Sequence, residues 1–349
     1  MHAVIAHPRR LARLSLASIA LLALAGWTGC GERVPPRVAV DAAVDKELAL
    51  PTFAGFSKTT GIKVRANYGI EVGGTNALVE RIVAEREAPR CDLFWNDGIL
   101  HTLALDRAGL LRPISSAAAS DFPAAARSPQ NTWIAIATDA RVLVVNAHQI
   151  AAARRPVSIY DLIDPQWYER AGIAKPLTGM SATHAACLFH TWGDAKAREF
   201  FVAIKRNARI LQSDSAVAHA VATGSLAFGL TNSSDAAAEI EAGAPVTIIY
   251  PDQDEYALGT LFIPMTAALV KDSPHPEPAD KLLDCLLSPE VARQLAEKPN
   301  ALVPLRSGVA ASDRVKSPDD VRTMPADFPA AAENWGATAK TLGELFAAP

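Results

Sequence analysis

The sequence predicts an α/β protein of two lobes, joined by crossing strands, with a ligand cleft between the lobes. Short apolar strands alternate with amphipathic helices, which is typical of a mainly parallel sheet covered on both faces. The length of 349 residues exceeds that of one small module and indicates two lobes or two domains. Half of the residues are apolar and 20% are charged, a composition that can bury a sizeable core and that argues against disorder and against a coiled coil.

Residues 1–29 have the pattern of an export signal. A basic start at 7–13 leads into an apolar run at 14–27, and Thr28-Gly29 stands directly before Cys30. This run is shorter than the ~20 residues that span a bilayer, and its flanks are those of a secretory signal. Cys30 resembles the acylated cysteine of a bacterial lipobox, although Trp27 stands where a leucine is usual. We expect a lipoprotein signal peptide and membrane anchoring through Cys30, with a tether at 30–36; the alternative is ordinary cleavage with Cys30 incidental.

The charge of the chain excludes one class of partner. The formal net charge is −3, and residues 1–29 contain three arginines and no acidic residue, so the remainder is at about −6. A mildly acidic protein has no basic stripe that could release the counterions of a phosphate backbone. We therefore expect no nucleic acid as a partner.

Three cysteines follow the signal, namely Cys91, Cys187 and Cys285. An odd number cannot all pair, and no C-x-x-C spacing indicates a zinc or redox site. Two alternatives stay open, at most one disulfide or burial of the thiols as small apolar side chains.

The first α/β series follows the tether. Apolar or alternating runs predict strands at 38–40, 62–68 and 92–95, and helical periodicity predicts helices at 45–58, 76–85 and 99–108. Gly61 and Gly109 end the first and third of these helices, and Thr75 is placed to cap the second. Two adjoining strand-like runs, at 133–137 and 141–146, then carry the chain into a second lobe.

The second series repeats the alternation. Strands are predicted at 209–212, 226–231 and 246–250, and helices at 182–191, 195–207, 215–223 and 234–242, with Asn232 placed to cap the last. The apolar segment 259–271 returns to the first lobe, and helices follow at 276–287, 289–298 and near 337–346. We expect lobe 1 at 37–138 plus 259–300, lobe 2 at 139–258, and a C-terminal helical segment at 301–349 that packs on the lobes.

Common catalytic and metal-binding patterns are missing from the sequence. Ser181 lies in Gly-Met-Ser-Ala-Thr, which lacks the closing glycine of a hydrolase nucleophile elbow. No P-loop, dinucleotide-binding glycine motif or zincin motif occurs, and His184 and His190 do not share a helical face. The acidic residues at 252–255 lack the spacing of an EF-hand and indicate a solvated turn. We therefore expect neither an enzyme nor a cofactor, and a metal site stays open.

Two loop-to-helix junctions, at 178–183 and 231–234, are rich in small polar residues. Free N–H groups and the positive end of the helix dipole make such junctions receptors for anions or carboxylates. Plain N-capping accounts for the same residue types. From the residues alone, both interpretations stay open.

Eight short stretches give the chain a resemblance to a known family. They lie at 56–64, 91–97, 108–111, 141–146, 181–186, 229–236, 259–264 and 287–291. In this order, over about residues 37–300, they resemble the substrate-binding component of bacterial ABC transporters, in the Fe(III)/putrescine/phosphonate branch of the type II periplasmic binding proteins. The resemblance implies a monomeric periplasmic protein whose lobes close on a small-molecule or metal-ion ligand and hand it to an ABC permease in the inner membrane.

By position, the resemblance also implies a pocket made of residues from both lobes. The residues that it places there are Asp45, Glu71, Thr75, Asn96, Asp97, Arg141, Ser181, Thr183, Asn232, Ser233 and Asp235. Structural alternatives stay open for two of them, since Asp45 can cap its helix and Arg141 can pair across the hinge.

One departure from the family pattern bears on the ligand. Iron-binding members carry a Tyr-Tyr pair after the Gly-Leu strand and commonly a histidine after the first strand, whereas this chain has Ser234-Asp235 and Asp45 at those places. We expect either iron in hydrated or chelated form, or an amino-bearing solute such as an aminophosphonate or a polyamine. The alternative functions are a ligand sensor coupled to a membrane kinase and, less favoured, an exported enzyme.

Overall fold

The strands form one mixed sheet in which β5 (Trp133–Asn146) is the shared member. The computed structural model describes residues 35–69 and 74–347, so the predicted export signal, Cys30 and Glu71 lie outside the described residues. From one edge to the other, the strand order is β2-β1-β3-β10-β5-β8-β6-β7.

The first half of the sheet has a parallel centre. β1 (Arg37–Ala43) lies between β2 (Lys63–Tyr68) and β3 (Leu93–Asn96) and pairs in parallel with both. β10 (Phe262–Val270) is antiparallel to β3 and also pairs with the two-residue strand β4 (Leu111–Arg112). Apart from its first residue and Ala39, β1 is buried, as expected of a parallel strand with both faces covered.

The second half of the sheet also has a parallel centre. β6 (Ala171–Ala174) lies between β7 (Arg209–Leu211) and β8 (Phe228–Asn232) and is parallel to both. β8 and β9 (Val246–Ile249) pair in antiparallel fashion with the later part of β5.

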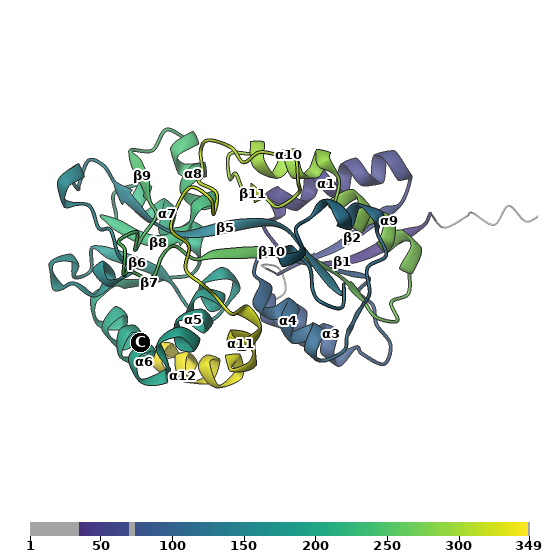
Figure 1. The fold of residues 1–349 in the computed structure, drawn as a ribbon, viewed down its shortest axis with the longest axis horizontal. Coiled ribbons are helices and arrows are strands. Elements are labelled where there is room, and N and C mark those ends of the chain that lie inside the picture. Colours follow the sequence, from purple (N-terminus) through teal and green to yellow (C-terminus); the bar gives the residue numbers. More distant parts are fainter. Residues whose placement is uncertain (1–34, 70–73, 348–349) are drawn as a thin grey trace, which may run out of the picture. The chain divides into compact units, whose positions relative to one another are not determined.

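β5 passes from one half of the sheet to the other, and all of its residues are buried. Its earlier part pairs with β10 and its later part with β8 and β9, so β5 and β10 cross between the halves side by side (Figure 1). The prediction of two adjoining strands is wrong at this point. The polar residues Thr138 and Asp139 break the apolar pattern but not the backbone pairing, because β10 continues opposite them.

Helices connect the strands in both halves. The first half holds α1 (Lys46–Thr60), α3 (Thr75–Ala84), α4 (Ile99–Arg107), α9 (Pro276–Leu286) and α10 (Pro289–Glu297), and the second holds α5 (Gly179–Trp192), α6 (Asp194–Asn207), α7 (Asp214–Ala222) and α8 (Ser233–Glu241). Short 3-10 turns lie at Ala117–Asp121, Ala124–Ala126, Ala152–Arg154, Ile159–Ile163 and Pro165–Trp167. The prediction that Thr75 caps α3 is wrong, because Gly74 holds that position and Thr75 begins the helix. α5 begins three residues earlier than predicted.

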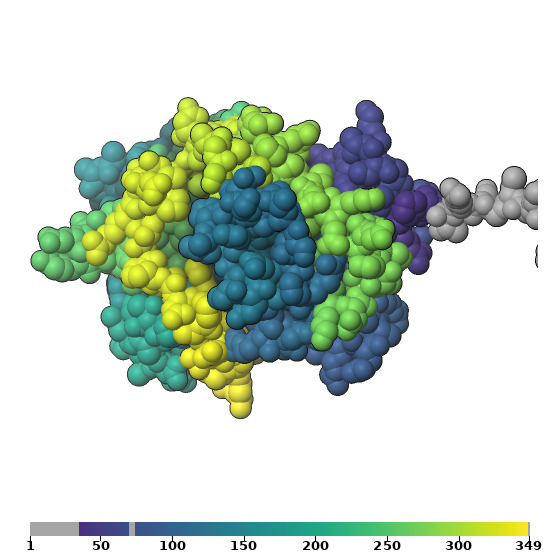
Figure 2. Space-filling model, turned by 45° about the vertical axis from the view of Figure 1, so that its right-hand side comes forward, coloured from purple at the N-terminus to yellow at the C-terminus, as the bar shows by residue number. Residues whose placement is uncertain are grey.

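The C-terminal segment contacts both halves. β11 (Val303–Pro304) pairs with β5, α11 (Phe328–Glu333) contacts α4 and α5, and α12 (Trp335–Ala347) packs on α5 and α6. Figure 2 shows this last part of the chain as a continuous yellow band across one face. The short elements β4, β6, β11 and α11 were not predicted, because two to six residues carry too little periodicity.

Two further sequence questions are answered by the described residues. None of the helices described here has both the length and the apolar character needed to cross a membrane. Cys91, Cys187 and Cys285 are unpaired, and the first two are buried. Burial raises the pKa of all three thiols, so they behave as small apolar side chains.

Candidate functional site

The polar residues of the candidate site collect where β5 crosses between the two halves. Asp45 and Asp97 follow the parallel strands β1 and β3, whose carboxyl ends lie at the same edge of the sheet. Arg141 lies in the middle of β5, directly opposite Asn232 at the end of β8. Loops from the first half therefore meet strand ends from the second at this point.

Arg141 is the centre of a buried polar cluster, with its side chain 2% exposed. Its Nη1 lies 2.9 Å from Asp214 Oδ1 and donates to Asn232 Oδ1, and its Nη2 donates to Ser181 Oγ at 3.1 Å. The Ser181 hydroxyl donates in turn to Asp214 at 2.9 Å. Asp214 thus balances the charge of Arg141, and Arg141 Nε is buried without a partner in the described part of the chain. Burial and then Arg141 lower the pKa of His184 to about 3, so that ring is neutral.

A second carboxylate from β5 occupies the start of α8. Asp139 accepts hydrogen bonds from the hydroxyls of Ser233 and Ser234 and from the Ser234 backbone N–H at 3.1 Å. Burial raises the pKa of Asp139, while these hydrogen bonds act in the opposite direction. Asn232 stands at the N-cap position, but the prediction that its side chain caps α8 is wrong, because its amide bonds Arg141 and Asp235 instead. The N-terminus of α8 is therefore satisfied by the protein's own carboxylate.

Asp97 and Asp235 form no ion pair with a cation among the described residues. Asp97 Oδ1 is buried and has no hydrogen-bond partner among the described residues. Burial, followed by the charges of Asp45, Asp214 and Asp139, raises the pKa of Asp97 to about 8. Burial and the same three neighbours raise the pKa of Asp235 well above its ordinary value. The site thus gathers more carboxyl groups than Arg141 can pair with.

The loop after β3 lies directly against the N-terminus of α5. A Cβ atom on Gly98 would stand 3.0 Å from Thr183 Oγ1 and 3.4 Å from the Gly179 carbonyl. Nearby, the Asn76 side chain donates to the Leu177 carbonyl at 3.4 Å. These contacts join the first half of the molecule to the second around the acidic cluster.

The predicted site residues fall into three groups. Asp45, Asp97, Arg141, Ser181, Asn232 and Asp235 are brought together, by contacts or by their charges. Ser233 serves Asp139, and Asn96 holds the turn after β3 through hydrogen bonds with Gly98 and Thr102. Thr75 and Thr183 are buried at the starts of α3 and α5, and Glu71 lies outside the described residues.

Sequence reasoning missed Asp139 and Asp214. Asp139 stands in the gap between the two apolar runs that form β5, so a charged residue inside a buried strand was the available signal. Asp214 is the first residue of α7, where an acidic residue is ordinary, and nothing local indicates its contact with Arg141. Over residues 35–69 and 74–347, no group of three or more His, Cys, Asp or Glu side chains is placed to hold a metal ion.

Comparison with known proteins adds a family match. Residues 37–298 match the family described as "Bacterial extracellular solute-binding protein". A periplasmic protein of Salmonella paratyphi A, to which 2-aminoethylphosphonate binding is provisionally assigned, is 28% identical over 319 residues, covering 87% of this chain and 88% of that protein. The "Fe(3+)-binding periplasmic protein" of Serratia marcescens is 28% identical over 176 residues. This match covers 50% of this chain and 51% of that relative.

A solved structure shows the same fold. The periplasmic binding protein AfuA of Actinobacillus pleuropneumoniae, with fructose-6-phosphate bound, superposes with a TM-score of 0.80 at 18% identity. The superposition covers 90% of this chain and 99% of that one.

Proposed function

The chain belongs to the bacterial extracellular solute-binding protein family and has the two-lobed α/β fold of the periplasmic binding proteins, and from this premise we propose that it captures a small amino-bearing solute, of which an aminophosphonate is the best fit. We further propose that it acts as a monomer in the periplasm and presents this solute to an ABC permease in the inner membrane. The family and fold confirm the resemblance found in the sequence.

The observation that carries the proposal is the surplus of carboxylates around Arg141. Asp97 and Asp235 are half-buried and have no ion-pair partner among the described residues, and their raised pKa values mean that ionising them costs free energy when no ligand is bound. An ammonium group between them would favour their charged forms and form charge-assisted hydrogen bonds. An anion without an amino group would instead disfavour the ionised forms of Asp97 and Asp235.

The N-terminus of α5 supplies the complementary end of the site. The first N–H groups of a helix have no intrahelical partner, and they lie at its positive end. At α5 this end lies against Gly98, next to the Asp97 carboxyl group. The start of α8 is already occupied by Asp139, so α5 is the better receptor for a phosphonate oxygen.

Iron is the weaker candidate on the side chains present. Ser234 donates its hydroxyl to Asp139, and Asp235 accepts from Asn232, so neither replaces the phenolate ligands of an iron-binding relative. A ferric chelate is retained as one arm of the test because the Serratia relative is named as Fe(3+)-binding.

We propose a binding role, and no catalytic one, for Ser181. Its hydroxyl proton is directed at the Asp214 carboxylate while its oxygen accepts from Arg141. A nucleophilic serine needs a base that takes its proton and then delivers it to a leaving group, and this carboxylate is already paired with a buried guanidinium.

The test is a thermal-shift and calorimetric screen of the mature protein with four matched compounds: 2-aminoethylphosphonate, ethylphosphonate, putrescine and ferric citrate. Ethylphosphonate lacks the amine and putrescine lacks the oxyanion. At a concentration of about 100 times Kd, a ligand stabilises by ~2.7 kcal/mol, which corresponds to about 4 °C in melting temperature for a chain of this size, at an unfolding entropy of ~2.1 cal/mol/K per residue. We expect this shift with 2-aminoethylphosphonate and a smaller one with either truncated compound.

Two variants test whether the acidic cluster around Arg141 causes the shift with 2-aminoethylphosphonate. Asp235→Asn should reduce the shift caused by 2-aminoethylphosphonate, and Glu87→Gln, a change of an exposed acid, should leave it unchanged. Equal shifts with ethylphosphonate and 2-aminoethylphosphonate, or a shift with ferric citrate alone, would contradict the amino-bearing ligand.

A further inference from the structure

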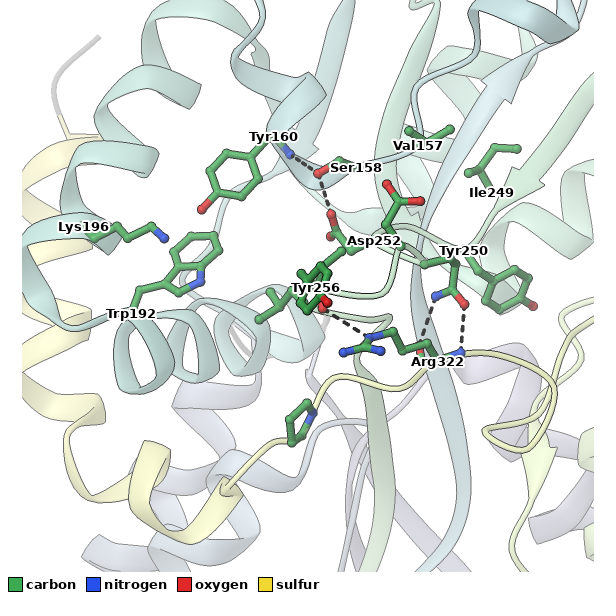
Figure 3. A pocket seen from close by; sticks show the side chains of 15 residues that line it. Val157, Ser158, Tyr160, Trp192, Lys196, Ile249, Tyr250, Asp252, Tyr256 and Arg322 are labelled. Atoms are coloured by element: carbon green, nitrogen blue, oxygen red, sulfur yellow. Dashed lines mark hydrogen bonds between the residues drawn. The ribbon is translucent and has the colours of Figure 1, made fainter.

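A separate cavity of about 740 Å³ lies in the second half of the molecule, within the size range of small-molecule sites. Its walls come from residues 157–160, the adjoining ends of α5 and α6, the end of β9 with the loop that follows it, and the side chains of Arg322 and Pro325 (Figure 3). It shares no lining residue with the acidic cluster around Arg141.

Aromatic side chains line this cavity, and two of them are exposed. Tyr256 is 93% exposed and Tyr160 is 41% exposed. The Tyr160 and Trp192 rings stack at a centroid distance of 5.5 Å. Figure 3 shows Tyr160 and Trp192 on one side of the cavity and Tyr256 on the other. Exposed aromatic rings gathered around one hollow mark a binding surface more often than a solvated one.

Two cationic side chains also line the cavity. Lys196 Nζ lies 5.2 Å from the centre of the Trp192 ring, and Arg322 Nε donates to the Ala257 carbonyl at 3.3 Å. Among the described residues, no carboxylate is in ion-pairing contact with either group. The terminal nitrogens of Arg322 are thus available for a bidentate contact with a carboxylate or a phosphate.

The acidic residues of the cavity do not cancel these cations directly. Asp252 accepts hydrogen bonds from the Ser158 hydroxyl and the Ile159 N–H, so its carboxylate is used within the wall. Asp254 is exposed, and its carboxylate has no hydrogen bond or ion pair within the described part of the chain, so it is an acceptor suited to ligand hydroxyl groups.

The wall that carries Tyr256 and Arg322 is held in place by its own hydrogen bonds. Gln253 Nε2 donates to the carbonyls of Pro251 and Arg322, and Gln253 Oε1 accepts from the Arg322 N–H at 2.8 Å. The Asp252 N–H donates to the Val157 carbonyl at 2.8 Å. A loop tied at these points presents its aromatic and guanidinium groups without a large ordering cost.

We propose that this cavity is a second ligand site, for a hydroxylated ring that carries one carboxylate or phosphate, such as an acidic sugar. The ring lies between Tyr256 and the Tyr160–Trp192 pair, the acidic group reaches Arg322 or Lys196, and ring hydroxyls donate to Asp254. This site is independent of the solute site around Arg141.

The experiment titrates the mature protein with glucuronate, glucose 6-phosphate and glucose, followed by calorimetry and by the indole N–H signals in NMR spectra. We expect glucuronate or glucose 6-phosphate to bind at least about tenfold more tightly than glucose, ~1.4 kcal/mol. Tyr256→Ala should weaken this binding by at least about tenfold, and Arg322→Gln should remove the preference for the acids over glucose. Tyr168→Ala, a change of another exposed tyrosine that lies outside the cavity, should have no effect.

Three results would overturn the proposal. They are absence of saturable binding of both acids at millimolar concentration, equal affinities in Tyr256→Ala and the unaltered protein, and loss of binding in Asp235→Asn. The last result would assign the acids to the site around Arg141. Because 2-aminoethylphosphonate binding is measured separately, either proposal can fail while the other stands.

Discussion

At the residue scale, the site is decided by which carboxylates have partners. Asp214 is paired with Arg141, and Asp139 accepts from two serines, whereas Asp97 and Asp235 have raised pKa values and no ion-pair partner among the described residues. The sequence indicated an acidic site with one arginine, but it did not distinguish the paired acids from the unpaired ones. The distinction depends on contacts between residues up to about a hundred positions apart, as between Asp139 and Ser233.

Asp97→Asn tests the effect of the unpaired acid on stability. The pKa of Asp97 is raised from 3.8 to about 8, so between these pH values the folded protein holds a proton that the unfolded chain has released. The free energy of unfolding of the ligand-free protein therefore falls as pH rises through this window. Asparagine has no such proton to lose, so the stability of the variant relative to the unaltered protein should rise with pH. Each kcal/mol of this difference corresponds to about 1.5 °C in melting temperature.

The control for this measurement is Glu87→Gln, whose melting curve should follow that of the unaltered protein at each pH. A difference between Asp97→Asn and the unaltered protein that stays constant from pH 5 to pH 9 would show that Asp97 is already ionised at low pH.

The affinity for 2-aminoethylphosphonate should rise from pH 7 to pH 9 in the unaltered protein, because an ammonium group binds the ionised Asp97.

Arg141→Met tests the buried ion pair. The variant leaves Asp214 without its cation inside the cluster, and breaking such a pair typically costs ~3–5 kcal/mol. Arg141→Met/Asp214→Asn removes both charges and should be more stable than Arg141→Met alone. Urea denaturation of the two single variants and the double variant gives the coupling energy, and strictly additive effects would show that the two side chains do not interact.

At the element scale, the two crossing strands and the start of α5 position the site. β5 places Asp139 and Arg141 two residues apart on a strand that both halves of the sheet share. The α/β alternation was predictable from the period of the apolar residues, and most helices lie within a few residues of the predicted ranges. The continuity of β5 was not predictable from the sequence, because it depends on hydrogen bonds from β10, more than a hundred residues away.

Gly98→Ala tests the contact between the loop after β3 and α5. The added Cβ atom would stand 3.0 Å from Thr183 Oγ1, so these two segments must separate slightly. Overpacking of this kind typically costs ~1–3 kcal/mol, and we expect solute affinity to fall by about tenfold. Calorimetry gives the affinity, and urea denaturation shows whether the ligand-free fold is retained.

Two control variants test whether the effect of Gly98→Ala comes from the contact with Thr183. Gly98→Ala/Thr183→Ala removes the atom that the new Cβ meets and should restore affinity. Gly55→Ala adds a Cβ atom that has nothing within 4 Å and should leave affinity unchanged. Normal affinity in Gly98→Ala alone would mean that the bound protein does not keep this contact.

At the scale of the whole molecule, a single sheet and the C-terminal segment connect the two halves. Besides β5 and β10, α11 contacts α4 in the first half and α5 in the second. A helix of six residues with two buried alanines carries almost no sequence signal, so its role as a connection appeared only in the structure. The hypothesis of a membrane anchor at Cys30 comes from the sequence alone, because Cys30 lies outside the described residues.

Cys30→Ser tests that anchor. Without the thiol no acyl chain can be attached, so we expect the protein to move from the membrane fraction to the soluble periplasmic fraction, and labelling with a radioactive fatty acid to disappear. Cys285→Ser, a change of a cysteine in the folded part, should leave the distribution unchanged. Recovery of the unaltered protein in the soluble fraction alone would support ordinary signal cleavage.

The sequence by itself determined the α/β class, the family and the acidic character of the site, because these follow from local periodicity, from short motifs in a given order and from residue types. Only the tertiary structure decided that two runs form the single strand β5, that Asp139 and Asp214 join the cluster, and that Asp97 and Asp235 have no ion-pair partner among the described residues. Each of these depends on burial and on contacts between residues distant in sequence, which set the free energy of a charge and which no local pattern records.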